Sequence, residues 1–356
     1  MLRASVGRPS ALHACRECLP SNHAHLSLPP FSQTPDCSSV ECKKGHPDRH
    51  PVDDGTLQAE LHDTNLVDTR KAIPMADFDE VWGQKLFLLE QGKKGYAGVE
   101  ALDFASRKLN LAQVQRIEDA LKAAATFPQL ALRTLNLAHA SFGTLGASKV
   151  AEIMAELWSV ADLDISNNTI FAQGCALLMN AIATNSRMKL ERLEISGNQI
   201  QAEGAIHVER WLMNPRCSLV DLSLKFNQLM PNGAARIAAA LPSCDSLKKL
   251  NLYQNHICDE GVEALALALE TNTSLEWLDL GHNDFGDDGA FQLSQVLRLK
   301  NDSLVHLDIR HNEMTHLGQD FLRRGLEKNA SVVHLWFGTT TVKDLRLMVG
   351  WPRIRM

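Results

Sequence analysis

The sequence lacks an apolar run of about 18 residues or more, the length that a helix needs to cross a bilayer. Its N-terminus also lacks the continuous apolar stretch of a secretory signal. A net charge of −6 and a pI near 6.2 do not match the strongly basic composition of most nucleic-acid-binding domains. These absences predict a protein that binds neither membrane nor nucleic acid.

Sequence motifs of catalysis are missing as well. The chain contains no G-x-x-x-x-G-K-[ST], the loop that cradles nucleotide phosphates, because no lysine follows glycine at that spacing. It also contains no G-x-S-x-G nucleophile turn and no H-E-x-x-H metal motif. We therefore expect a protein that is not an enzyme and that needs no cofactor.

Paired cysteines are absent from the larger part of the chain. Four of the eight cysteines lie near the N-terminus, and four are scattered singly: Cys15, Cys18, Cys37 and Cys42, then Cys175, Cys217, Cys244 and Cys258. The second group has no paired spacing, which is typical of proteins in a reducing compartment. We expect a cytoplasmic location.

What the sequence does contain is a repeat. From about residue 99 the pattern L-x-x-L-x-L-x-x-N-x-I-x-x-x-G recurs about every 28 residues, in about nine copies. The first position is Val99, Leu132, Val160, Leu190, Leu219, Leu247, Leu275, Leu304 and Val332. Position 9 is Asn168, Asn198, Asn227, Asn255, Asn283 and Asn312 in the middle six copies. The period therefore predicts an array of similar structural units.

Each conserved position of the repeat has a physical reason. Positions 4 and 6 alternate with polar residues, which predicts one buried face of a short strand. The asparagine follows that strand, where its amide can both donate to and accept from open backbone groups. Glycine at position 15 allows either a close backbone approach or a positive φ. Apolar residues at positions 16, 19 and 23, such as Val262, Leu265 and Leu269, then lie on one helix face.

This pattern resembles leucine-rich repeats of the ribonuclease-inhibitor type, which also occur in NOD-like receptors and in the Ran GTPase-activating protein. The resemblance covers about residues 99–345. It implies an α/β fold: a right-handed horseshoe solenoid of about nine repeats, with a parallel sheet on the concave face and helices on the convex face. It says less about function, since unrelated binding proteins use the same scaffold.

The remaining parts of the chain differ in composition. Residues 1–75 are rich in Pro, Ser and His, which predicts disorder. Their Cys15-x-x-Cys18 pair, with Cys37, Cys42 and nearby histidines, leaves zinc binding as an alternative, and their early arginines leave organelle targeting as another. Apolar residues at helical spacing over 76–91 predict a capping helix within residues 76–98. Residues 346–356 form a C-terminal tail.

The candidate site is a partner-binding surface on the C-terminal half of the concave face. Positions 3, 5, 7 and 8 of each repeat line that face, and in the N-terminal half they are small or acidic. In the C-terminal half they become aromatic and basic: Lys225, Phe226, Lys249, Tyr253, Trp277, Asp279, His282, His306, Asp308, Arg310, His311, His334 and Trp336. Trp, Tyr and Arg dominate binding energy at protein interfaces. We expect Asp279 and Asp308 to orient the basic groups.

Two other interpretations of these residues stay open. The aromatic side chains can stack on one another merely to shield strand edges, and Trp336 can pack on Trp351 in a C-terminal cap. The four histidines fall in adjacent repeats, so two of them can approach each other. However, neither Cys nor Glu completes a ligand set, and nearby Lys249 and Arg310 would repel a cation, so we predict no metal site.

The leading functional hypothesis is a protein-binding scaffold or inhibitor, because an extended curved surface suits a large partner. A GTPase-activating regulator of a small GTPase is an alternative, although this chain ends at Arg353-Ile-Arg-Met356 without the acidic tail usual in Ran GTPase-activating proteins. The repeat portion of an innate-immune sensor is a further alternative, and the missing nucleotide-binding loop disfavours a complete NOD-like receptor.

Overall fold

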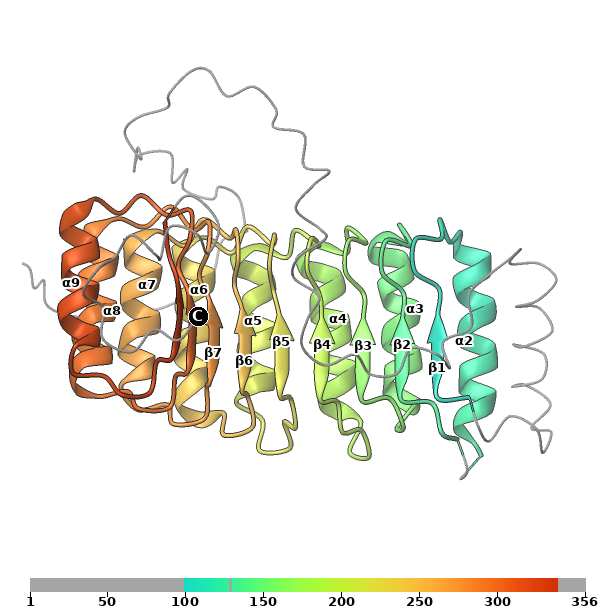
Figure 1. The fold of residues 1–356 in the computed structure, drawn as a ribbon. Coiled ribbons are helices and arrows are strands. Elements are labelled where there is room, and N and C mark those ends of the chain that lie inside the picture. The colour runs from blue at the N-terminus through green and yellow to red at the C-terminus, as the bar shows by residue number, and fades with distance from the viewer. Residues whose placement is uncertain (1–98, 128–129, 339–356) are drawn as a thin grey trace, which may run out of the picture. The chain divides into compact units, whose positions relative to one another are not determined.

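A computed structural model describes residues 99–127 and 130–338 of the chain. These residues form nine strands in one sheet, and every strand pairs in parallel with the next one along the chain (Figure 1). The strands are β1 (Ala101–Asp103), β2 (Thr134–Asn136), β3 (Asp162–Asp164), β4 (Arg192–Glu194), β5 (Asp221–Ser223), β6 (Lys249–Asn251), β7 (Trp277–Asp279), β8 (His306–Asp308) and β9 (His334–Trp336). We call the unit that contains strand βn repeat n.

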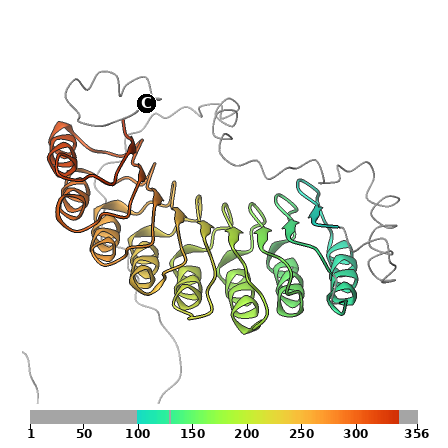
Figure 2. The ribbon, with the colours of Figure 1, turned by 60° about the horizontal axis from the view of Figure 1, so that its bottom comes forward.

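One helix connects each strand to the next, as parallel pairing requires. The helices are α2 (Leu111–Ala125), α3 (Gly143–Glu156), α4 (Phe171–Thr184), α5 (Gln201–Leu212), α6 (Met230–Ala240), α7 (Cys258–Leu269), α8 (Asp287–Leu299) and α9 (His316–Leu326), with a 3₁₀ turn η3 (Leu241–Ser243) after α6. Figure 2 shows the strands on the inner side of a curve and the helices on its outer side. The predicted α/β solenoid is thus confirmed for the described residues.

The hydrophobic core lies between the sheet and the helix layer. The middle leucines of neighbouring strands, such as Leu250 and Leu278, are in register and fully buried. The three predicted helix positions of repeat 6, Val262, Leu265 and Leu269, are also fully buried. Because a three-residue strand buries little by itself, each repeat depends on its neighbours for most of its stability.

The asparagine column forms a continuous ladder inside the solenoid. Asn198 donates its side-chain amide to the carbonyls of Ile165 (3.0 Å) and Ile195 (3.0 Å), and its side-chain oxygen accepts from the backbone N–H of Asn168 (2.9 Å). The same exchange recurs from Asn168 to Asn312, and Asn198 is fully buried. The predicted double use of the amide, as donor and acceptor, is what links one repeat to the next.

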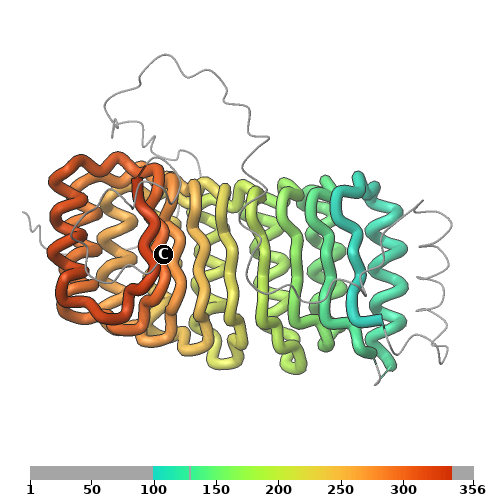
Figure 3. The backbone as a smooth tube through the Cα atoms, viewed as in Figure 1, coloured from blue at the N-terminus to red at the C-terminus, as the bar shows by residue number. Residues whose placement is uncertain are grey.

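The glycine column serves close packing. A Cβ on Gly233 would lie 3.2 Å from the Cα of Ala202 in the preceding helix, and 3.0 Å from the Cβ of Leu229. Apart from Gly143, Gly197 and Gly338, the positive φ angles fall on ordinary residues at positions 8, 10 and 12, for example Phe226 (59°) and Met230 (60°). Figure 3 shows these turns stacked in the same place from repeat to repeat. Of the two roles predicted for the glycine, close approach is the one observed.

Several predictions lie outside the described residues. These are the disordered segment 1–75 with its Cys and His residues, the capping helix within 76–98, the last residues of the repeat region at 339–345, and the tail 346–356. The proposed contact between Trp336 and Trp351 lies partly outside them as well.

Candidate functional site

The thirteen candidate residues fall on strands and on the turns that follow them. The strand members are Lys249, Trp277, Asp279, His306, Asp308, His334 and Trp336. The turn members are Lys225, Phe226, Tyr253, His282, Arg310 and His311. The structure therefore brings all thirteen together along repeats 5 to 9. We call the eight ring-bearing members, Phe226, Tyr253, Trp277, His282, His306, His311, His334 and Trp336, the ring patch.

The turn members of the ring patch form one row of touching rings. The centroids of Phe226 and Tyr253 are 5.5 Å apart, and the two rings meet edge to face. His282 follows at 5.7 Å from Tyr253, and His311 stacks on His282 at 5.6 Å. Aromatic pairs at these distances attract one another, so the row is held in place before any partner binds.

The strand members form a second stack, at the C-terminal end of the sheet. His306 and His334 occupy the same position in neighbouring strands, and their rings are 4.4 Å apart and nearly parallel, at 4°. Trp336 lies within 16° of both planes, at centroid distances of 5.9 and 5.8 Å. Trp277 is in register with His306 but joins no ring–ring contact among the described residues. It is therefore the large ring of the patch that is not engaged in the stack.

Burial favours the neutral form of two of the stacked imidazoles, those of His306 and His311. It lowers the pKa of His306, and the adjacent His334 and Lys249 lower it further. Burial likewise lowers the pKa of His311, with His282 contributing. The Nδ1 atom of His306 is buried and has no hydrogen-bond partner. At neutral pH the rings of His306 and His311 therefore act as uncharged aromatic surface.

One of the two acids orients a base as predicted. Asp308 holds Arg310 through hydrogen bonds from the guanidinium to both carboxylate oxygens, at 2.6 to 3.0 Å. Asp279, by contrast, accepts a hydrogen bond from the backbone N–H of Gly281 at 2.9 Å. Burial, with Asp308 close by, raises the pKa of Asp279 to about 7. Arg310 is thus fixed in the patch by Asp308, while Asp279 binds the backbone of the turn that follows its own strand.

The N-terminal half of the same face is acidic. Arg192 on β4 lies between two carboxylates, 3.5 Å from that of Asp162 and 3.9 Å from that of Asp221. Burial raises the pKa of Asp162, Asp221 and also Glu194. Along one sheet the surface thus changes from crowded carboxylates to rings and cations.

The four histidines of the ring patch form two pairs, His282 with His311 and His306 with His334. The histidines approach only in pairs, and no group of three or more His, Cys, Asp or Glu within residues 99–127 and 130–338 is arranged to hold an ion.

A groove on the sheet's other rim was not predicted from the sequence. It measures about 520 Å³ and is lined by Arg133, Trp158, Arg187, Lys189 and Glu191, among others. The Arg187 guanidinium lies 4.8 Å from the centroid of the Trp158 ring. These residues fall in the loops before β2 to β4, outside the four positions that sequence analysis assigned to the concave face. Only their recurrence within a few residues on either side of the first apolar position of each repeat could have indicated a common rim.

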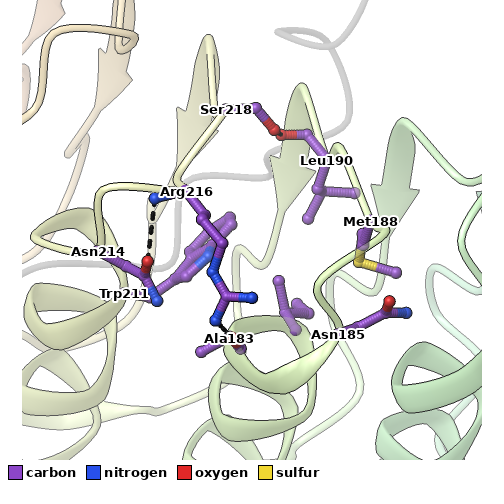
Figure 4. A pocket seen from close by; sticks show the side chains of 9 residues that line it. Ala183, Asn185, Met188, Leu190, Trp211, Asn214, Arg216 and Ser218 are labelled. Atoms are coloured by element: carbon purple, nitrogen blue, oxygen red, sulfur yellow. Dashed lines mark hydrogen bonds between the residues drawn. The ribbon is translucent and has the colours of Figure 1, made fainter.

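A second hollow, shown in Figure 4, lies between the loops before β4 and β5. It is lined by Met188, Leu190, Trp211 and neighbouring residues, and its volume of about 10 Å³ holds about one water molecule. Arg216 closes it by donating to the carbonyl of Ala183 at 3.1 Å. This hollow is too small for a metabolite or cofactor.

Comparison with known proteins agrees with the repeat. A family model described as "Leucine Rich repeat" matches residues 187–207, 243–266 and 271–294. The chain is 27% identical over 214 residues to NACHT, LRR and PYD domains-containing protein 9 of Bos taurus, and 28% identical over 144 residues to protein 14 of that series in Mus musculus. These stretches are 49% and 40% of this chain, but 20% and 14% of the relatives. The chain thus matches no more than a fifth of either relative's length.

Two solved structures are also similar. The leucine-rich repeat-containing protein LegL7 of Legionella pneumophila has a TM-score of 0.46 and 18% identity, covering 70% of this chain and 77% of that one. Leiomodin-1 actin-binding site 2 has a TM-score of 0.34 and 18% identity, covering 41% of this chain and 84% of that one.

The repeat, the parallel sheet and the family match together define this chain as a leucine-rich-repeat protein. The repeat region is of the kind that binds other proteins. The leucine-rich-repeat fold is typically a non-enzymatic scaffold for such binding. The ribonuclease-inhibitor subtype remains a prediction. No helix within residues 99–127 and 130–338 combines the length and apolarity needed to span a membrane.

Proposed function

We propose that this protein binds a protein partner on the concave face of repeats 5 to 9, and that the ring patch supplies most of the binding energy. The observation that carries the proposal is the double array of rings, one row on the turns and one on the strands. Aromatic side chains held rigidly by their neighbours lose little conformational entropy on binding, so their contacts favour high affinity.

Exposure and charge support the same surface. Phe226, in the turn after β5, is 43% exposed, and Lys249 on the neighbouring strand β6 is exposed as well. Trp277 lies between Lys249 and His306 in register, half-buried and outside the ring stack. A partner with aromatic or acidic side chains would fit this combination of rings and cations. Stacking for internal stability alone does not require the neighbouring exposed cation.

The test is affinity purification with the full-length chain, comparing the wild type with Trp277→Ala. We expect Trp277→Ala to reduce recovery of the specific partner and to weaken its measured affinity by about 2 kcal/mol. Leu267→Ala is the matched control, because Leu267 is an apolar residue of repeat 6 that is 59% exposed on the helix side. Equal affinity of wild type and Trp277→Ala, with an unchanged fold, would remove the ring patch as the binding surface.

A GTPase-activating role and a role in innate-immune sensing remain predictions from resemblance. A GTP-hydrolysis assay with small GTPases separates the first from simple binding. Under the present proposal the chain leaves hydrolysis rates unchanged, even for a GTPase that it binds.

A further inference from the structure

The groove in the loops that precede the first strands, which we call the rim groove, holds more positive than negative side chains. Its cations are Arg133, Arg187 and Lys189, and its carboxylates are those of Glu100 and Glu191. Glu191 is engaged by Arg133 at 3.8 Å. Within the described part of the chain Arg187 and Lys189 form no ion pair, and both are exposed. In a chain of net charge −6, these two cations are open to an outside anion.

Trp158 lines the same groove and carries a donor that is not used. The guanidinium of Arg187 lies over its ring, 4.8 Å from the centroid, as a cation–π contact. The Nε1 atom of Trp158 is buried and has no hydrogen-bond partner. An indole N–H can only donate, so the missing partner is an acceptor. A buried donor without a partner costs stability, unless a bound molecule supplies the acceptor.

Ser159 carries a second unused polar group. Serine directly precedes the first apolar position of repeat 3 and of repeats 5 to 9. In repeat 5, Ser218 donates to the carbonyl of Leu190 at 2.9 Å, and in repeat 7, Ser274 donates to the carbonyl of Cys244 at 2.8 Å. The hydroxyl of Ser159 is buried as well but makes no such link. The loop before β3 therefore presents two unsatisfied polar groups at the rim groove.

We propose that the rim groove binds an acidic segment of a partner protein in an extended conformation. The carboxylates of this segment approach Arg187 and Lys189, because charge-assisted hydrogen bonds are the strong ones. Its backbone carbonyls accept from the Trp158 indole and from the Ser159 hydroxyl. Among the described residues the Arg187 guanidinium contacts only the Trp158 ring, so it turns toward the arriving carboxylate and uncovers the indole N–H.

The size of the groove suits a short stretch of chain. Its volume of about 520 Å³ lies within the range of about 300–1,000 Å³ that is usual for ligand pockets. The rim groove lies on repeats 1 to 4, whereas the ring patch lies on repeats 5 to 9. The inference therefore does not rest on the function proposed above, and either site can fail without the other.

The test is nuclear magnetic resonance of the full-length protein with isotope-labelled tryptophan, titrated with a capped tetraglutamate peptide. Trp158→Phe identifies the indole signal of Trp158 among the six tryptophans. We expect tetraglutamate to shift this signal in a saturable way, because the free N–H gains an acceptor, and capped tetraglutamine to leave it in place. A signal that does not move with tetraglutamate, or that moves equally with tetraglutamine, would overturn the proposal.

An arginine variant tests the role of charge. Arg187→Gln should weaken the affinity for tetraglutamate about tenfold, since it removes a charge-assisted hydrogen bond. Arg298→Gln is the matched control, because it removes the same charge from an exposed arginine on α8, and it should leave the affinity unchanged. Equal losses in the two variants would mean that the peptide responds to overall charge, and the site would be refuted.

A serine variant separates binding from stability. Ser159→Ala should weaken tetraglutamate binding without lowering the urea midpoint of unfolding, because the hydroxyl has no partner to lose. Ser274→Ala, at the same position of repeat 7, removes the bond to Cys244 and should lower the midpoint while leaving binding unchanged. If Ser159→Ala instead lowers the midpoint and leaves binding intact, the hydroxyl serves the fold alone and the proposed contact is wrong.

Discussion

The two halves of the solenoid share one backbone and differ in their inner surface. Repeats 1–4 and 5–9 have strands of the same length in the same register, and repeats 3–8 each contribute an asparagine to one ladder. On that common frame, β3 and β4 present Asp162, Asp164 and Glu194, whereas β7 to β9 present mostly rings. The leucine and asparagine positions are therefore shared by the two halves, whereas the inner-face positions differ between them.

The largest expected effect is on the free energy of unfolding, through the asparagine ladder that both halves share. Asn198→Ala in the first half and Asn255→Ala in the second each remove a fully buried amide with the same set of backbone partners. Each should lower the free energy of unfolding by about 3 kcal/mol, because buried backbone groups lose their partners. Urea unfolding measures this cost. If the two variants differ by more than about 1 kcal/mol in the free energy of unfolding that they lose, the asparagine ladder does not stabilise the two halves equally.

The next effect concerns recognition in the second half alone. Tyr253→Ala removes the ring that joins Phe226 to His282 and should weaken partner binding by about 2 kcal/mol. Asp164→Ala, on the inner face of repeat 3, should leave binding unchanged. Titration calorimetry with the purified partner checks both. Equal losses would place the binding surface across both halves.

A pH effect distinguishes the two acids of the second half. The pKa of Asp279 is raised to about 7, so between about pH 4 and 7 the folded state holds a proton that the unfolded state releases. Stability from this group is therefore lost as pH rises through that range. Asp279→Asn should be more stable than the wild type by about 2 kcal/mol at pH 8, with the gap closing below about pH 4.

The matched control for this pH effect is Asp308→Asn. It removes the negative charge and one of the two oxygens that accept hydrogen bonds from Nε and Nη2 of Arg310, and should destabilise the fold at neutral pH. Thermal unfolding across pH 4 to 8 separates the two variants. If the wild type does not lose stability relative to Asp279→Asn as the pH rises, the raised pKa of Asp279 is contradicted.

The smallest effect lies on the rim of the first half. Arg133 and Glu191 form an ion pair at 3.8 Å, and both side chains are more than half exposed. Arg133→Ala should change the free energy of unfolding by less than about 0.5 kcal/mol, since solvent screens such pairs. A larger loss in thermal unfolding would give the rim groove a structural role.

Much of the fold could be predicted because the same residue type recurs at each structural position of the repeat. Leu250 and Leu278 mark the strands, and Asn255 marks the turn that follows, so period and residue type together predict element order and register. The contact between adjacent histidines also followed from their positions in successive repeats.

Other features depend on geometry that the pattern does not encode. Asp164 and Asp279 each accept a hydrogen bond from the backbone N–H two residues later, so these acids of the inner face also stabilise the turn. Phe226 adopts a left-handed backbone that its side chain does not favour, because the ladder on both sides holds the turn.

Hydrogen–deuterium exchange on the full-length protein, with and without its purified partner, tests most directly where binding occurs. We predict slower exchange in the strands and following turns of repeats 6 to 8, around Tyr253, Trp277 and Arg310, with the helices α3 to α5 unchanged. Protection confined to the helix layer, or to the acidic strands β3 and β4, would contradict binding at the ring patch.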